Sequence, residues 1–234
     1  MTEPASDTTE RHLTPRGELA LRRRAAHFEV ISNGVFLMDT RDGRSERLLA
    51  QATLAAAVHP KRVLVGGLGV GFTAAAALAD PTVDEVVVVE VEAAIIAWQR
   101  DHFAGHAGDV QGDRRCRVVH ADLLTWLATT TGRFDAICLD IDNGPGWVVT
   151  DHNAGLYGDA GLDRLAARTV SDGALGVWCA ARDARLEQGL RPRFTSVQTH
   201  EVPVSRGAPD VIAVAASPVD HRRRDRGHGA GMAG

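Results

Sequence analysis

Residues 61–92 read KRVLVGGLGVGFTAAAALADPTVDEVVVVEVE, and this stretch decides the fold class. The unbroken apolar run Val63–Val65 predicts a strand covered on both faces, and a second strand is expected over Glu85–Glu90. Between them, a glycine-rich turn leads into a small-residue helix expected over Thr73–Leu78. A strand, a helix and a strand in this order predict an α/β fold with a mostly parallel sheet.

Four glycines follow the first strand, and an acid ends the second. The glycines, at Gly66, Gly67, Gly69 and Gly71, let a ligand approach the backbone closely. Glu90 is placed to accept hydrogen bonds from the two hydroxyls of a ribose. The combination predicts a nucleoside site, with a purely structural turn as the alternative. The G-x-G-x-G spacing differs from the G-x-G-x-x-G turn of dinucleotide enzymes and is typical of folds that bind S-adenosylmethionine (SAM).

The composition is that of one α/β domain with short appendages. The chain has 234 residues, of which 44% are hydrophobic, and a formal charge of −4, so nothing favours nucleic acid as a partner. The sequence has no apolar signal core and no apolar run as long as a membrane span, so a soluble, cytoplasmic protein is expected. The three separated cysteines are expected to be free, buried thiols in a reducing compartment.

The sequence divides into four parts. Residues 1–26 are expected to be disordered, with a short basic helix or arm over Gly17–Ala26. Residues 27–60 are expected to form a small antiparallel β-element with a hairpin turn at Asn33-Gly34, followed by a helix over Ser45–Val58. Residues 61–216 form the nucleoside-binding, Rossmann-like domain, and residues 217–234 a disordered basic tail.

The rest of the 61–216 domain alternates between helix and strand. Helices are expected over Ala93–Phe103, Asp122–Ala128, Leu162–Thr169 and Ala184–Leu190. Strands are expected over Arg117–His120, Phe134–Leu139, Ala174–Cys179, Phe194–His200 and Val211–Ala215. This order predicts a mostly parallel sheet with an antiparallel edge.

Several of these segments, taken in order, resemble one protein family. A β-element followed by VLVGGLGVG, VVVVEVE, HADLLTWL and FDAICLDIDNGPGW is similar to the spermidine synthase (polyamine aminopropyltransferase) family, over residues 28 to 200. The resemblance implies a SAM-dependent methyltransferase fold, an adenosyl sulfonium donor and a small amine acceptor. It also implies a homodimer formed through the β-element.

The resemblance assigns roles to individual positions. It places the four glycines beside the donor sulfonium and Glu90 on the ribose. It places Asp122 at the adenine amino group, with Leu123 against the ring. It places Asp140, at the end of a strand, on the acceptor amine, and Glu46 in an acidic position of the same site.

The chain also departs from the family pattern. Gly69 stands where the family has an acid facing the amine of decarboxylated SAM, so its absence favours ordinary SAM, whose carboxylate an acid would repel. Arg44 stands where the family has a tyrosine, and an arginine can pair with a carboxylate. These departures predict methyl transfer from SAM. The alternatives are aminopropyl transfer from decarboxylated SAM, transfer of the 3-amino-3-carboxypropyl group, and a non-catalytic nucleoside-binding module.

The acceptor site is predicted at the end of the Phe134–Leu139 strand. Asp140 and Asp142 are the predicted catalytic acids, and Asn143 and Tyr157 the predicted acceptor contacts. Each has a structural alternative: the acids can stabilise turns or cap helices, and Tyr157 can pack in the core. His102 and His106 are four residues apart, but no third ligand is placed beside them, so no metal site is predicted.

Overall fold

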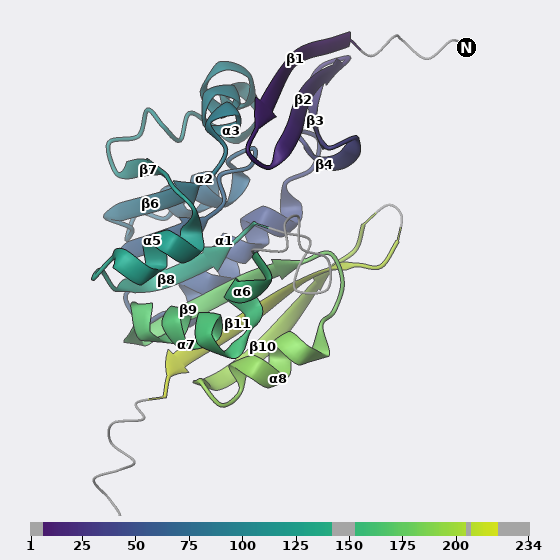
Figure 1. Cartoon of the computed structure of the whole chain (residues 1–234). Coiled ribbons are helices and arrows are strands. Elements are labelled where there is room, and N and C mark those ends of the chain that lie inside the picture. Colours follow the sequence, from purple (N-terminus) through teal and green to yellow (C-terminus); the bar gives the residue numbers. More distant parts are fainter. Residues whose placement is uncertain (1–6, 142–152, 205–206, 220–234) are drawn as a thin grey trace, which may run out of the picture.

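In a computed structural model, which describes residues 7–141, 153–204 and 207–219, the chain forms two β-sheets. The first sheet is antiparallel and has the order β1-β2-β3-β4 (Figure 1). Its strands are β1 (Asp7–Thr14), β2 (Gly17–Arg24), β3 (His27–Ser32) and β4 (Val35–Asp39). The predicted hairpin at Asn33-Gly34 is confirmed, because these residues join β3 to β4 and both have positive φ angles.

The second sheet has seven strands in the order β10-β11-β9-β8-β5-β6-β7. The strands from β9 to β7 in this order are parallel, and β11 and β10 extend the β9 edge antiparallel, as predicted. The strands are β5 (Arg62–Gly66), β6 (Glu85–Glu90), β7 (Cys116–His120), β8 (Phe134–Leu139), β9 (Thr169–Cys179), β10 (Phe194–Val202) and β11 (Asp210–Pro218). Because the chain passes from β5 to β6 on one side and returns to β8 on the other, a crevice is expected at their carboxyl ends.

Helices cover both faces of this sheet (Figure 1). One core contains α1 (Arg44–Ala56), α2 (Phe72–Ala79), α3 (Ala93–Trp98) and apolar residues of β2 and β3. The other contains α5 (Leu123–Thr129), α6 (Ala154–Tyr157), α7 (Asp159–Arg168) and α8 (Ala184–Leu190). None of the helices in the described part of the chain has the length and apolar character that crossing a bilayer requires.

The predicted disorder and basic helix within residues 1–26 are wrong from Asp7 onward. Residues 17–24 pair with both β1 and β3, and Leu19 and Leu21 are buried. The sequence GELALRRR has good helix formers, but the pairing and burial available on both sides decide for a strand. The helix predicted over Ser45–Val58 is observed over Arg44–Ala56.

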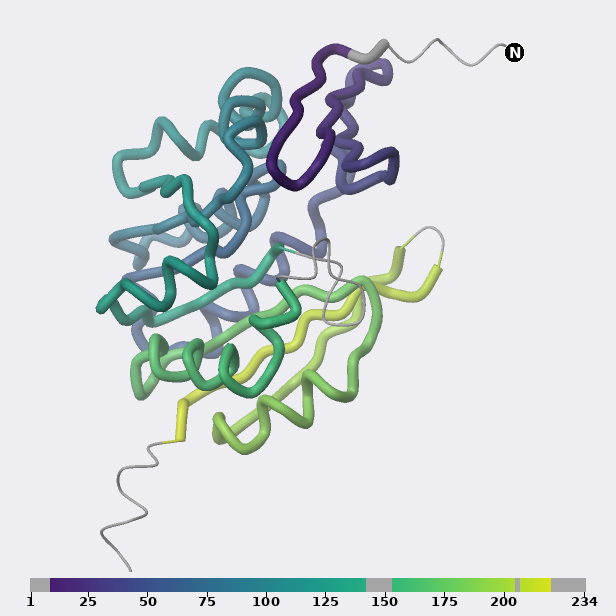
Figure 2. The backbone as a smooth tube through the Cα atoms, in the orientation of Figure 1, coloured from purple at the N-terminus to yellow at the C-terminus, as the bar shows by residue number. Residues whose placement is uncertain are grey.

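The first sheet packs against the segment that follows β6 (Figure 2). In that segment the predicted helix is divided into α3, a π-helix η1 (Gln99–Phe103) and α4 (Ala104–Ala107). Glu10 of β1 accepts hydrogen bonds from Trp98 Nε1 at 2.6 Å and pairs with His102 Nε2 at 2.7 Å. These contacts hold the N-terminal strands beside the end of β6, where the site lies.

Candidate functional site

A cavity of about 320 Å³ lies between the first sheet and the carboxyl ends of β5, β6 and β8. It is lined from below by the glycine turn after β5 and by residues that follow the other two strands. From above it is lined by the β1–β2 and β3–β4 turns. The crevice expected from the strand order is therefore partly covered by a second element, which leaves a partly open cavity for a ligand.

The glycine turn brings the backbone to the cavity. Gly67, Gly69 and Gly71 line it and have φ angles of 88°, 51° and 108°, in the region that favours glycine. A Cβ atom on Gly67 would lie 2.1 Å from the Asp140 carbonyl oxygen, so no larger residue fits there. Gly66 serves packing instead, because a Cβ atom there would lie 2.7 Å from the Leu123 side chain.

Glu90 lies at the floor of the cavity and is only 8% exposed. Its Oε2 atom accepts a hydrogen bond from the backbone N–H of Leu68, and its Oε1 atom accepts one from Glu92, both at 2.8 Å. Burial raises the pKa of this carboxyl, and the two backbone donors oppose that shift. The turn therefore holds an acid in one orientation, with each oxygen still able to accept a further hydrogen bond.

Asp122 and Leu123 line the cavity at the end of β7. Asp122 is the N-cap of α5, since its side chain accepts a hydrogen bond from the Thr125 N–H at 2.8 Å. The capping alternative is thus confirmed, and it is compatible with a ligand contact. Leu123 is buried and presents an apolar surface to the cavity, as an aromatic base would require.

Two carboxyl groups with raised pKa values share the other end of the cavity. Burial raises the pKa of Asp140 to about 6, opposed by a 2.6 Å hydrogen bond from Thr73 Oγ1. Burial, with the nearby charge of Asp140, raises the pKa of Glu46 to about 7. Thr73 Oγ1 also lies 3.3 Å from the Glu46 carbonyl oxygen, so this hydroxyl of α2 stands between Asp140 and the first turn of α1. Such a pair can hold or release a proton near neutral pH.

Not every predicted site residue reaches the cavity. Arg44 is not part of the described lining: its side chain is 64% exposed and pairs with Asp42 at 2.8 Å at the start of α1. Tyr157 packs against the core that contains α5–α8, which was the structural alternative for this residue. It does not line the cavity. Asp142 and Asn143 lie outside the described residues.

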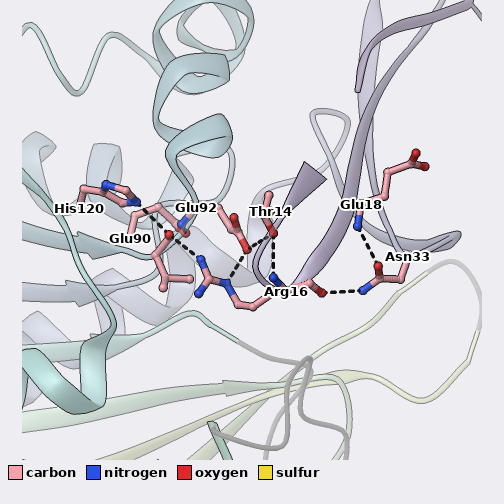
Figure 3. A network of polar contacts seen from close by, with 8 residues as sticks. Thr14, Arg16, Glu18, Asn33, Glu90, Glu92 and His120 are labelled. Carbon is pink, nitrogen blue, oxygen red and sulfur yellow. Dashed lines mark hydrogen bonds and ion pairs between the residues drawn. The ribbon is translucent and has the colours of Figure 1, made fainter. Parts of the chain in front are cut away.

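The first sheet contributes cavity residues that the sequence did not identify. Arg16, in the β1–β2 turn, lies between the two sheets and bonds Glu92 (Figure 3). Leu37 and Met38 of β4 form an apolar wall, with Met38 Sδ 3.4 Å from where a Cβ atom of Gly69 would lie. Trp178 of β9 completes the lining near Asp140. The Asn33-Gly34 pair predicted one turn of this sheet. Because β1 and β2 were not predicted, the sequence did not place Arg16 at the cavity.

Acidic side chains outnumber basic ones in the described lining. The cavity contains one basic residue, Arg16, whose guanidinium already bonds the Glu92 carboxylate at 2.6 Å. Its acidic lining residues are Glu18, Glu46, Glu90, Glu92, Asp122 and Asp140. A cationic ligand is therefore favoured over an anionic one. Among the described residues, no three His, Cys, Asp or Glu side chains are arranged to hold a metal ion.

Residues 44–157 match the family model of the spermine/spermidine synthase domain. The matched segment contains the glycine turn, Glu90, Asp122 and Asp140. The chain is spermidine synthase-like in sequence. This result confirms the resemblance drawn from the motifs.

Curated relatives of this spermidine synthase-like chain agree. A polyamine aminopropyltransferase from Synechococcus sp. (strain JA-2-3B'a(2-13)) is 29% identical over 170 residues, which are 70% of this chain and 54% of that protein. A polyamine aminopropyltransferase from Pseudomonas syringae pv. tomato is 30% identical over 95 residues, covering 40% of this chain and 33% of that protein. The chain thus spans about half the length, or less, of these curated relatives.

Solved structures show the same fold. A spermidine synthase in complex with the transition-state analogue AdoDATO superposes with a TM-score of 0.76 at 16% identity, over 91% of this chain and 74% of that one. The spermidine synthase from Thermotoga maritima gives a TM-score of 0.74 at 15% identity, over 91% and 73%. The spermidine synthase-like fold therefore includes the N-terminal strands as well as the central sheet.

Proposed function

We propose that this chain transfers an aminopropyl group from decarboxylated SAM to a small amine. The observation that carries the proposal is the charge of the lining, in which six acids face one arginine that is already paired. Decarboxylated SAM is a sulfonium with an amine on its transferred arm, so it carries positive charge at both ends of that arm. Ordinary SAM would bring a carboxylate toward Asp140 and Glu46, where no arginine of the described lining is available to receive it.

This proposal replaces methyl transfer, which the sequence favoured. Arg44 was one of two reasons for expecting a carboxylate, and it faces Asp42 outside the cavity. The other reason, Gly69 in place of an acid, remains, but Asp140 and Glu46 supply negative charge at the same end of the cavity. The curated relatives are polyamine aminopropyltransferases, which also supports the aminopropyl alternative.

The donor lies with its adenosine between Glu90 and Leu123. Glu90 accepts hydrogen bonds from the ribose hydroxyls, Asp122 contacts the adenine amino group, and Leu123 packs on the ring. The sulfonium then lies over the Gly67–Gly71 turn, which lines the cavity. This orientation directs the aminopropyl arm toward Asp140.

The reaction is an in-line displacement at the carbon next to sulfur. The neutral acceptor nitrogen donates its lone pair to that carbon, the C–S bond breaks, and its electron pair stays on sulfur as the thioether of methylthioadenosine. The acceptor nitrogen is neutral because the Asp140 carboxylate first takes a proton from its ammonium form, and the product nitrogen leaves as an ammonium. Asp140 and Glu46 hold the amine groups in place before transfer. The reaction rate therefore rises through orientation of the reactants and removal of the amine proton.

Mass spectrometry of the spent donor tests this proposal. The chain is incubated with putrescine and, in separate reactions, with decarboxylated SAM or SAM. We expect methylthioadenosine and an amine enlarged by one aminopropyl group, from the decarboxylated donor alone. S-adenosylhomocysteine would restore methyl transfer, an amine enlarged by an aminocarboxypropyl group would show that arm to be transferred, and binding without any product would indicate a non-catalytic module.

The affinity for the cationic donor should rise with pH. Glu46 and Asp140 have folded-state pKa values of about 7 and about 6, so they are largely protonated at pH 5.5 and ionised at pH 8. A cationic arm binds the ionised pair, and binding therefore releases protons in this window. We expect roughly a tenfold gain for decarboxylated SAM between these pH values, and little change for neutral methylthioadenosine, measured by calorimetry. Equal pH dependence for both ligands would contradict this role of the pair.

Introducing an acid at Gly69 should strengthen the preference for the decarboxylated donor. Gly69 has a φ angle of 51°, which aspartate tolerates, and a Cβ atom there would approach only Met38 Sδ, at 3.4 Å. We expect Gly69→Asp to raise the ratio of affinities for decarboxylated SAM and SAM about tenfold, because the acid attracts the amine and repels the carboxylate. Gly69→Asn is the matched control without the charge, and an equal change in both variants would contradict the expectation.

A further inference from the structure

We propose that Arg16 is a positioning residue, which holds the segment Glu90–Glu92 in the orientation that binds ribose. The inference rests on the proposed function, because it concerns the adenosyl donor. Arg16 lies in the turn between β1 and β2, 74 positions before Glu90 in the numbering, and it is the basic residue of the described lining. It is therefore the point at which the N-terminal sheet can act on the donor end of the cavity.

Arg16 contacts this segment with two different groups. Its Nε atom donates to Glu92 Oε1 at 2.6 Å, and a terminal nitrogen donates to the Val91 carbonyl oxygen at 2.8 Å (Figure 3). The Glu92 side chain is 14% exposed and also accepts from Thr14 Oγ1 at 3.3 Å. A planar guanidinium bonded to both a side chain and the adjacent backbone fixes the position of that backbone, which a single contact would not.

The fixed backbone is the one that orients the ribose acid. The Glu92 N–H, in the peptide whose carbonyl belongs to Val91, donates to Glu90 Oε1 at 2.8 Å. Arg16 and Glu90 thus hold the two sides of one peptide group. A shift of that peptide would turn the Glu90 carboxylate away from the ribose, although the bond from Leu68 to its other oxygen would remain. His120 Nε2, 3.1 Å from the same Val91 oxygen, supports this peptide from β7.

Arg16 is itself held from behind by the β3–β4 turn. Asn33 Nδ2 donates to the Arg16 carbonyl oxygen at 3.1 Å, and Asn33 Oδ1 accepts from the Glu18 N–H at 2.9 Å (Figure 3). A Cβ atom on Gly17 would lie 1.9 Å from Asn33 Oδ1, and Gly17 has a φ angle of 117°, so the contact requires glycine there. These contacts fix the backbone that carries Arg16, so the turn is pre-organised rather than ordered by the ligand.

The test compares methylthioadenosine with its 2′-deoxy analogue, because only the first can use both hydroxyl contacts of Glu90. Wild type should bind the ribose form more tightly. Arg16→Met, which keeps the length of the side chain and removes its donors, should lower the affinity for methylthioadenosine about tenfold and change that for the deoxy analogue much less. Arg16→Lys should recover part of the preference. Arg11→Gln, which breaks an exposed ion pair in the same hairpin, should leave it unchanged.

A double-mutant cycle separates positioning from a general loss of structure. If Arg16 acts through Glu92, then Arg16→Met, Glu92→Gln and the double variant should lose similar amounts of ribose preference. An Arg16→Met protein that keeps the wild-type preference, or that loses both ligands equally, would overturn the inference. A wild-type protein that binds neither ligand would instead overturn the proposed function.

Discussion

Asp140→Asn is expected to lower turnover at least a hundredfold while leaving methylthioadenosine binding within a few-fold of wild type. Asparagine is nearly isosteric and can still accept the hydrogen bond from Thr73 Oγ1, so the local structure should persist. What is lost is the carboxylate that takes the amine proton, and general bases contribute about 10²–10⁴ in rate. Turnover is measured as methylthioadenosine released from decarboxylated SAM and putrescine.

Asp135 supplies the matched control, because it lies near the opposite end of the same strand, β8. Its carboxylate accepts a hydrogen bond from the Arg62 N–H at 2.7 Å, away from the cavity. Asp135→Asn should leave turnover unchanged. If Asp140→Asn retained wild-type turnover, Asp140 would have no part in the transfer, and Glu46 would be the remaining described acid at that end of the cavity.

Glu90→Ala is expected to weaken methylthioadenosine binding about a hundredfold. Hydrogen bonds to a charged group contribute about 1.5–3 kcal/mol each. This variant removes the hydrogen bonds from both ribose hydroxyls at once. Glu90→Ala also leaves the backbone N–H groups of Leu68 and Glu92 without their acceptor, so folding stability should fall too and is measured separately from binding. Calorimetric titration measures the affinity, and thermal denaturation of the unliganded protein measures the stability.

Glu85→Ala is the control for this variant. Glu85 begins the strand that Glu90 ends, and its carboxylate pairs with Arg62 at 2.6 Å on a half-exposed surface. Such an ion pair contributes little, so the affinity should not change. Equal affinities of Glu90→Ala and wild type would show that the ligand does not bind through the ribose acid.

The central sheet could be predicted because each signal is local. The run VVVVE gives β6 and its terminal acid with the observed bounds, and FDAICL does the same for β8. Glycines with positive φ angles mark the turn between β5 and α2 for the same reason, since few other residues adopt that backbone. Glu90 and Asp140 follow from the strand ends, where parallel sheets hold ligands, whereas Glu46 lies on α1 and came from the family resemblance.

The N-terminal sheet could not be predicted in this way, because its stability comes from pairing between strands. β1 is polar except for Leu13, and β2 contains good helix formers, so neither has a clear pattern of its own. Without these strands, nothing in the sequence places Arg16 at the cavity. The position of the Arg44 side chain could not be predicted either, because it depends on the direction in which the first residue of α1 points. Asp42, two residues earlier, pairs with the Arg44 guanidinium outside the cavity.

The central claim is that the cavity accepts an adenosyl sulfonium whose arm ends in an amine. Calorimetric titration of the wild-type protein with decarboxylated SAM and with SAM, at pH 8 where Asp140 and Glu46 are ionised, tests it most directly. The decarboxylated donor should bind at least tenfold more tightly, because its arm meets the carboxylates without a carboxylate of its own. Tighter binding of SAM, or no binding of either compound, would contradict the claim.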